Sequence, residues 1–225
     1  MESVMWGLEL SVSDQSAELP GWLARHGAAL AALPAVILCE SFAPIEDLGA
    51  AVRFHDADVP AAMIVLGFAE RADLLAALGS PVLMAALAAR PGGVQASAAC
   101  FRRHRTPLPG DNMSRDSAVS YVVRYRLPCD DAPGFVAEYL AGHLPIQADF
   151  PGIRRVLGFE PIEGGPQGAT PAGYLVGNEV SFDDVAAFCA AMESPVLDRL
   201  RAHSGVLPPR DGLCTHHLMK RRLLK

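Results

Sequence analysis

The sequence predicts an α+β protein made of two ferredoxin-like βαββαβ repeats in one chain. Three observations lead to this prediction: the chain repeats itself at a nearly constant spacing, each copy shows strand and helix patterns in the same order, and a polar segment with prolines separates the copies. With 225 residues, the chain is long enough for two small domains of this kind.

The internal repeat has two registers. In the first part of each copy, matching residues are 117 positions apart, as for His26 and His143. Further along the spacing is 114, which relates Ser80-Pro81-Val82 to Ser194-Pro195-Val196. The change falls in a polar connection, residues 46–59 and 163–170, where a loop tolerates a different length at little cost. One repeat with one loop-length difference therefore accounts for both registers.

Each copy is expected to contain four strands and two helices. Alternating side chains indicate first strands, and helical spacing that ends near a proline indicates first helices. The expected strands are residues 6–12, 36–42, 61–68, 94–104, 121–127, 153–159, 172–182 and 213–222, and the expected helices are 18–33, 70–89, 133–150 and 183–202. Ser80-Pro81 and Ser194-Pro195 should break the second helix of each copy. The predicted domains are residues 1–105 and 118–225, joined by a linker at 106–117.

A four-stranded sheet with both helices on one face leaves its other face open, and we expect the other copy to cover it. In the strand at 121–127, two sets of side chains are expected. The helix-facing set is Tyr121, Val123, Tyr125 and Leu127, whereas Val122, Arg124 and Arg126 point the other way. In the first strand of copy one, Glu9 points away from the helices. We therefore predict that Glu9 and one of the two arginines approach each other between the sheets.

The composition is typical of a globular protein and argues against several partner classes. Hydrophobic residues make up 51% and charged residues 20%, and the net charge is -6. Basic residues form only short runs, at 102–105 and 220–225, so we expect neither nucleic-acid nor membrane binding. The five cysteines lack metal-type spacing and no secretory signal is recognisable, which predicts free thiols and a cytoplasmic location.

Copy two contains a further set of residues that forms a recognisable pattern: Phe135, Tyr139, His143-Leu144-Pro145, Pro151-Gly152-Ile153-Arg154-Arg155, Phe182, Phe188 and Ser194-Pro195. With this pattern, copy two resembles the EthD-like branch of the dimeric α+β barrel proteins. Copy one shares it only through its alignment with copy two. The resemblance implies an intramolecular dimeric α+β barrel in which the two sheets pack face to face. Members of that superfamily include polyketide cyclases, haem-degrading and cofactor-free monooxygenases and proteins without established activity, so the fold alone does not specify a reaction.

His143 and Tyr139 are the candidate catalytic residues. His143 is expected near the end of its helix, because the residue before Pro145 disfavours helical geometry. A neutral imidazole there could act as a general base, and Tyr139, on the same helical face, could orient a substrate. The alternative is that His143 caps the helix C-terminus. His26 holds the matching position in copy one, which we interpret as the structural half.

Arg154 and Asp149 are the candidate substrate-binding residues. Arg154 and Arg155 point to opposite faces of a strand, so only one of them can reach a pocket and hold a carboxylate or phenolate. Asp149 could hydrogen-bond to His143. The alternatives are an ion pair at the sheet edge for the arginine and a solvated loop position for the aspartate.

No cofactor and no metal are expected. Cys214 and His216 share a strand face but supply only two ligands, and His217 faces the other side. The glycine-rich segment 163–168 has no helix behind it to bind a phosphate.

The leading hypothesis is an EthD-like protein that acts on a small aromatic or polyketide-like molecule by cofactor-free acid-base chemistry, with His143 as the base. One alternative is a non-enzymatic small-molecule-binding or stress-associated barrel protein, and a further one is a haem-handling monooxygenase. Two fused pairs could associate as a homodimer. A partly polar cavity that touches His143 would favour the enzyme, whereas a solid core would favour the non-enzymatic protein.

Overall fold

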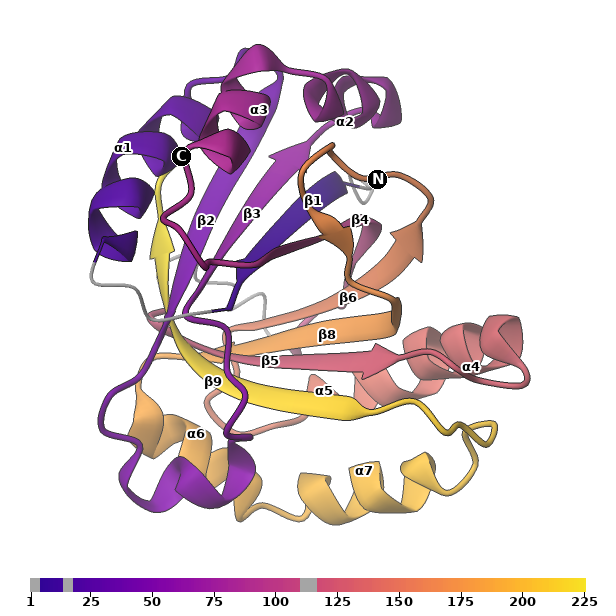
Figure 1. Cartoon of the computed structure of the whole chain (residues 1–225). Helices are drawn as coiled ribbons and strands as arrows, with labels where there is room; N and C mark the ends of the chain where they lie inside the picture. The colour runs from indigo at the N-terminus through magenta and orange to yellow at the C-terminus, as the bar shows by residue number, and fades with distance from the viewer. Residues whose placement is uncertain (1–4, 14–17, 110–116) are drawn as a thin grey trace.

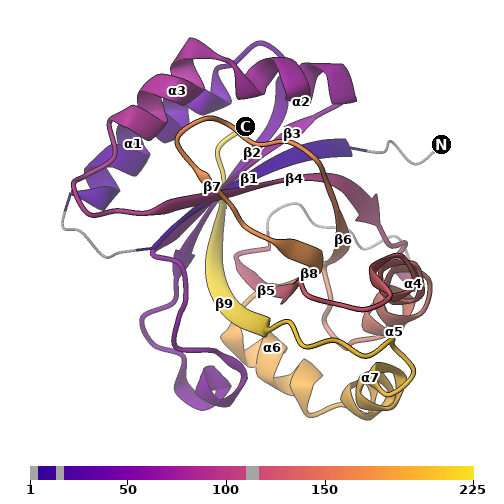
Figure 2. The same ribbon diagram turned by 45° about the vertical axis from the view of Figure 1, so that its right-hand side comes forward.

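A computed structural model of the chain describes residues 5–13, 18–109 and 117–225, and it shows a closed barrel of eight antiparallel strands with helices outside (Figure 1). Residues 110–116 of the expected linker lie outside the described residues. The helices form two layers on opposite sides of the barrel, α1 to α3 on one side and α4 to α7 on the other (Figure 2).

The first half of the chain runs through seven main elements and one 3-10 helix. They are β1 (Met5–Val12), α1 (Leu19–Ala31), β2 (Val36–Pro44), η1 (Gly49–Phe54), β3 (Ala62–Phe68), α2 (Arg71–Leu78), α3 (Pro81–Ala88) and β4 (Ala96–Arg105). The second half contains β5 (Val119–Arg126), α4 (Ala132–Glu138), a π-helical turn η3 (Tyr139–His143), α5 (Leu144–Gln147), β6 (Arg155–Ile162), β7 (Thr170–Pro171), β8 (Tyr174–Phe182), α6 (Val185–Met192), α7 (Val196–Ser204) and β9 (Cys214–Leu223). Each expected strand and helix has a counterpart here, whereas the two-residue strand β7 was not expected.

The strand order closes the sheet on itself. Neighbours around the ring are β1-β3-β2-β9-β5-β8-β6-β4, and β4 pairs with β1. The first-half strands are therefore ordered β4-β1-β3-β2 and the second-half strands β9-β5-β8-β6. Two antiparallel junctions, β2 with β9 and β4 with β6, join the halves. A closed ring leaves its eight strands without a free edge.

The strand faces lie as the alternation predicted. Leu8, Leu10 and Val12 pack in the core beneath α1 to α3, and Val123 and Tyr125 pack in the core beneath α4 to α7. The barrel interior holds a third, smaller apolar cluster: Phe42, Met63, Val65, Phe101, Val122, Leu157, Phe159 and Met219. Each sheet thus buries an apolar outer face against helices and a mixed inner face against the other sheet.

The Ser-Pro pairs break the second helix of each half, as expected. Ser80 separates α2 from α3 and accepts a hydrogen bond from the Val82 N–H, while α6 and α7 are separated at Ser194 and Pro195. In the described part of the chain no single helix meets the length and hydropathy needed to cross a membrane; α2 and α3, bent by 48°, do so only when taken together.

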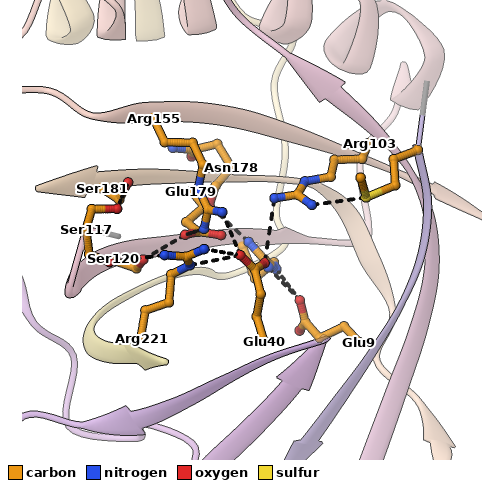
Figure 3. Close-up of polar contacts among 12 residues, drawn as sticks. Glu9, Glu40, Arg103, Ser117, Ser120, Arg155, Asn178, Glu179, Ser181 and Arg221 are labelled. Atoms are coloured by element: carbon orange, nitrogen blue, oxygen red, sulfur yellow. Dashed lines mark hydrogen bonds and ion pairs between the residues drawn. The ribbon is translucent and has the colours of Figure 1, made fainter. Parts of the chain in front are cut away.

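Among the described residues, seven charged side chains are buried, and most of them form ion pairs between the halves. Figure 3 shows the contacts around Glu40 inside the barrel. Arg124 donates from Nε to Glu9 Oε2 at 3.1 Å, which confirms the predicted approach of Glu9 to one of two arginines. Glu40 lies 2.6 Å from Arg155, 2.5 Å from Arg221 and 3.6 Å from Arg103. Glu179 pairs with Arg155 and accepts from Ser120 at 2.7 Å. The fully buried carboxylates are thus neutralised by arginine.

Candidate active site

A cavity of about 160 Å³ lies between the second-half sheet and helices α4 to α7, and His143 and Tyr139 both line it. Most of its wall is apolar or aromatic, with contributions from Phe54, Tyr121, Tyr125, Phe150, Val180 and Leu200. Arg201 and Ser204 also line it and are exposed, so the cavity opens to the surface beside α7. A partly polar cavity at His143 is the feature that was expected to favour an enzyme, in contrast to a solid core.

The helix that carries His143 does not leave helical geometry before Pro145, so this expectation was wrong. Leu144 has φ -65° and ψ -42°, and its N–H bonds to the Tyr139 carbonyl, five residues back. A proline in an α-helix clashes with the carbonyl four residues before it, and the wider π turn gives Pro145 room. Such turns are frequent at functional sites. His143 consequently lies one turn before the end of the helical segment, facing the cavity.

His143 is a buried, neutral imidazole. Its exposed fraction is 6%, and its Nδ1 has no hydrogen-bond partner among the described residues. Burial, together with the nearby His203, lowers the pKa of His143 to about 4. The ring is therefore unprotonated at neutral pH, which is the state that a general base requires.

Tyr139 is committed to a hydrogen-bonded chain. Its ring stacks on His143 with centroids 4.7 Å apart, and its hydroxyl donates to Asn178 Oδ1 at 2.5 Å. Asn178 Nδ2 in turn donates to Gln147 Oε1 at 3.1 Å. Burial raises the pKa of Tyr139 well above its ordinary value. Tyr139 therefore holds its proton and positions the imidazole rather than exchanging protons itself.

Asn178 and Gln147 were not recognised from the sequence as site residues. Both are buried and line the cavity, Asn178 from β8 and Gln147 from α5. The only sequence signal concerned Asn178, a polar residue that lies between Val176 and Val180 on the otherwise apolar, helix-facing side of its strand.

Comparison with known proteins identifies the fold but no family. No family model matches the chain, and no curated protein is similar in sequence. Solved structures that are similar over almost the whole chain include an anthrone oxidase-like protein (TM-score 0.60, 11% identity, 99% of this chain and 94% of that chain). A candidate monooxygenase from Fusobacterium nucleatum (0.60, 10%, 100% and 94%) and a chlorite dismutase variant from Candidatus Nitrospira defluvii (0.55, 9%, 98% and 92%) are further examples. These are dimeric α+β barrel proteins.

The chain has the dimeric α+β barrel fold. In this barrel the site lies outside the strand ring, in one helical layer, and is closed partly by the other half. Phe54 of η1 reaches across from the first half and packs edge-on against Phe188 of α6, with ring centroids 5.8 Å apart. The following Asp56 is held on β9, where its carboxylate accepts the His216 N–H at 2.7 Å.

Arg154 and Asp149 lie away from the cavity of this barrel. Arg154 forms a two-oxygen ion pair with Asp183, and Asp149 pairs with Arg199 at 2.8 Å; all four side chains are at least one-third exposed. Arg155, on the opposite strand face, points into the barrel interior instead. Neither adjacent arginine reaches the cavity, so a substrate-binding role for Arg154 or Asp149 stays a prediction without support from this geometry.

Cys214 and His216 form a contact but no metal centre. Cys214 Sγ lies 3.5 Å from His216 Nε2, and His216 Nδ1 lies 3.3 Å from Asp56 Oδ2. Burial raises the pKa of the Cys214 thiol to about 11, so the sulfur is a poor ligand and nucleophile at neutral pH. Within residues 5–13, 18–109 and 117–225, no three His, Cys, Asp or Glu side chains are arranged to hold a metal ion.

Haem does not fit the cavity at His143. Pockets for drug-sized ligands measure roughly 300–1,000 Å³, and haem is larger than most such ligands, whereas this cavity measures about 160 Å³. The His143 ring also packs against both Tyr139 and His203. We therefore derive no role for haem at this site.

A second cavity, of about 420 Å³, lies beside β4, β6 and β7. Its wall is mainly backbone and small side chains of residues 161–173. Tyr174, at its edge, donates its hydroxyl to Glu9 at 3.0 Å. The other titratable groups of this cavity are Glu163, which is exposed, and Cys100, where burial raises the pKa of the thiol to about 11. Because neither of them is a buried neutral base, we place the candidate site at His143.

Proposed function

We propose that this barrel protein binds a small, single-ring aromatic molecule in the His143 cavity and acts on it by cofactor-free acid-base chemistry, with His143 as the base. The observation that carries the proposal is a buried neutral imidazole on the wall of a cavity that is lined mainly by aromatic and aliphatic side chains. The imidazole would take a proton from an acidic hydroxyl or carbon of the bound molecule.

The size of the cavity narrows the substrate class. A cavity of about 150 Å³ accommodates benzene, and the His143 cavity measures about 160 Å³. This supports a single ring inside the cavity, with any substituent directed to the mouth at Arg201 and Ser204. A fused polyketide ring system would need wider space.

The amide of Gln147 would orient the ring. Gln147 accepts from Asn178 through Oε1, which leaves its NH2 group to donate to a bound oxygen. A phenolic hydroxyl could then accept from Gln147 while it donates to Nε2 of His143. A phenol is therefore the simplest probe of this site.

We also propose that the chain is a tandem repeat, residues 1–105 and 118–225, in which only the second, EthD-like copy has kept a site. The shared strand order of the halves supports the repeat. At the two repeat spacings, Tyr139, Gln147 and Asn178 correspond to the apolar first-half residues Trp22, Leu30 and Ile64, all nearly inaccessible to solvent. The buried Trp22 indole donates to the Ala86 carbonyl at 2.9 Å, which supports the proposal that its ring fills the space equivalent to the cavity.

A second candidate function is binding without turnover. The lowered pKa of His143, about 4, makes it a weak base, and the Tyr139 hydroxyl is already engaged by Asn178. A carrier or sensor of small aromatic molecules would need no stronger base.

Binding of phenol, followed by NMR and calorimetry, tests the site. We expect phenol to bind the wild-type protein and the larger 1-naphthol to bind much more weakly. Tyr139→Trp, which introduces the residue found at position 22, should fill the cavity and abolish binding. The matched control is His26→Ala, which alters the counterpart histidine in the half without the cavity and should leave phenol binding unchanged.

Turnover separates the two candidate functions. For any phenol that the protein converts, His143→Ala should lower the rate by roughly two to four orders of magnitude, the usual contribution of a general base. An equal rate in that variant would remove His143 as the base. Binding without conversion of any tested phenol would support the carrier or sensor.

A further inference from the structure

A buried base needs a route by which its proton leaves. His143 is almost inaccessible to solvent, and the Tyr139 hydroxyl beside it donates to Asn178, so that hydroxyl offers no exit. The titratable and charged groups around the cavity are Tyr139 on the same helix, Tyr121 and Tyr125 on β5, Arg201 and His203 on α7, and His216 on β9. Of these, His203 is the one whose ring contacts the imidazole of His143.

His203 lies between His143 and the surface. Its ring is 5.4 Å from that of His143, centroid to centroid, at an angle of 61°. Its Nε2 lies 3.2 Å from Glu138 Oε1, and Glu138 is about half exposed. The Nδ1 atoms of both histidines are buried and have no partner among the described residues. In each ring the buried Nδ1 is therefore without a hydrogen bond within the described structure, while His203 contacts Glu138 through its other ring nitrogen, Nε2.

Gly142 makes this arrangement sterically feasible. A Cβ atom at position 142 would lie 2.1 Å from His203 Nε2 and 3.0 Å from Glu138 Oε1. The ring of His203 therefore rests on the backbone of the π turn, where a side chain other than hydrogen would displace it. Glycine and the π turn together bring His203 to His143.

The first half has no counterpart of this chain of groups. At the repeat spacings, His203, Glu138 and Gly142 correspond to Ala89, Gly21 and Arg25, although His26 is retained. The three groups thus occur only in the half that has the cavity. If His203, Glu138 and Gly142 serve the cavity, they are expected to be found in the same half as the cavity, as they are.

We propose that His203 and Glu138 carry protons between His143 and solvent, an inference that rests on the proposed function. His143 accepts the substrate proton on Nε2. When rotation of the two rings brings their Nδ1 atoms, neither of which has a partner in the described part of the chain, within hydrogen-bond reach, His143 releases its Nδ1 proton to Nδ1 of His203. His203 then releases its Nε2 proton to Glu138, from which water removes it. Each imidazole exchanges one tautomer for the other, and no charge accumulates. His203 is a positioning residue in this scheme because it does not touch the substrate.

The test uses the full chain with 15N-labelled histidine. We would measure the titration midpoint of His143 and the exchange of its ring N–H with water in wild type and in His203→Phe, which keeps an aromatic ring but cannot carry a proton. We expect exchange to slow by about a hundredfold, the lower end of what a positioned proton-transfer group contributes. The midpoint should rise, because His203 contributes to the lowered pKa of His143 in the wild-type protein. Glu138→Gln, a change at a half-exposed side chain, should slow exchange without unfolding the protein.

The matched control is His26→Phe, which alters a histidine of the first half, away from the cavity and the proposed route, and should change neither quantity. Unchanged exchange in both His203→Phe and Glu138→Gln would overturn the proposal. Phenol binding distinguishes a failure of the proton route from a failure of the proposed binding site. If phenol binds and exchange is unchanged, the route is wrong and the site stands; if exchange slows and phenol does not bind, the route stands and the substrate class is wrong.

Discussion

Arg124 and Glu9 meet inside the barrel although 115 positions separate them in the sequence. Both are nine-tenths buried or more, and the Glu9 carboxylate also accepts from Tyr174 and Ser11. A buried carboxylate is tolerable only when it is paired and hydrogen-bonded. The ion pair therefore holds the two halves together, because breaking it would leave a buried charge without its counter-ion.

Arg124→Met should destabilise the protein by about 3–5 kcal/mol, because it leaves Glu9 buried without its counter-ion. Chemical denaturation at pH 7 measures the change. Adding Glu9→Met to Arg124→Met should recover part of the loss, since the uncompensated charge is then gone. Arg199→Met, which removes an exposed ion pair with Asp149, is the control and should cost under about 1 kcal/mol.

Stability should fall in acid through Glu40. Burial alone would raise the pKa of Glu40, but Arg155, Arg103 and Arg221 outweigh it and lower the pKa to about 2. The folded state thus holds its proton less tightly than the unfolded chain, so the contribution of Glu40 is complete above about pH 4.5 and is lost as pH falls toward 2. Linkage makes this roughly 3 kcal/mol. Glu40→Gln should lower stability at pH 7 and flatten this part of the profile.

His143 should make a second, smaller contribution to the loss of stability in acid. Because burial and His203 lower the pKa of His143 to about 4, the unfolded chain binds a proton between about pH 6.5 and 4 that the folded chain does not. Stability should therefore decline as pH falls through that range. His143→Phe should remove this segment of the curve in urea titrations at several pH values. A curve identical to wild type would show that the imidazole is not buried in the neutral form.

Tyr139→Phe should affect chemistry far less than His143→Ala. The raised pKa of Tyr139 and its bond to Asn178 give it a positioning role, and phenylalanine preserves the ring stack. Turnover of a converted phenol should fall by less than about tenfold. Stability should fall by roughly 1–3 kcal/mol, because Asn178 loses a partner. A loss as large as that of His143→Ala would assign proton transfer to the hydroxyl.

Most of the fold could be predicted from the sequence because the patterns that specify it are local. Alternation of side chains along a strand places Val123 and Tyr125 on one face and Arg124 on the other without knowledge of the partner strand. The Ser-Pro pairs end helices through the missing N–H of proline wherever they occur. Even the meeting of Glu9 with Arg124 followed from strand faces and the repeat.

The site was predictable only in part. His143 and Tyr139 were identified through spacing on one helix, but the π turn that keeps both facing the cavity depends on the packing of Pro145. Side-chain alternation along the strand could not show whether Arg154 or Arg155 reaches a pocket. It places the two side chains on opposite faces but does not identify the groups that each side chain contacts. Both proved to be engaged in ion pairs elsewhere.

The sequence by itself determined the order of elements, the faces of the strands, the breaks in the helices and the pairing of a buried acid with a buried arginine. Only the tertiary structure decided that Asn178 and Gln147 line a cavity together with His143, that His203 contacts the His143 ring, and that Phe54 of the other half helps to close the cavity. The physical reason is that propensity and periodicity act between near neighbours in the chain, whereas a cavity is the space left when distant elements pack together.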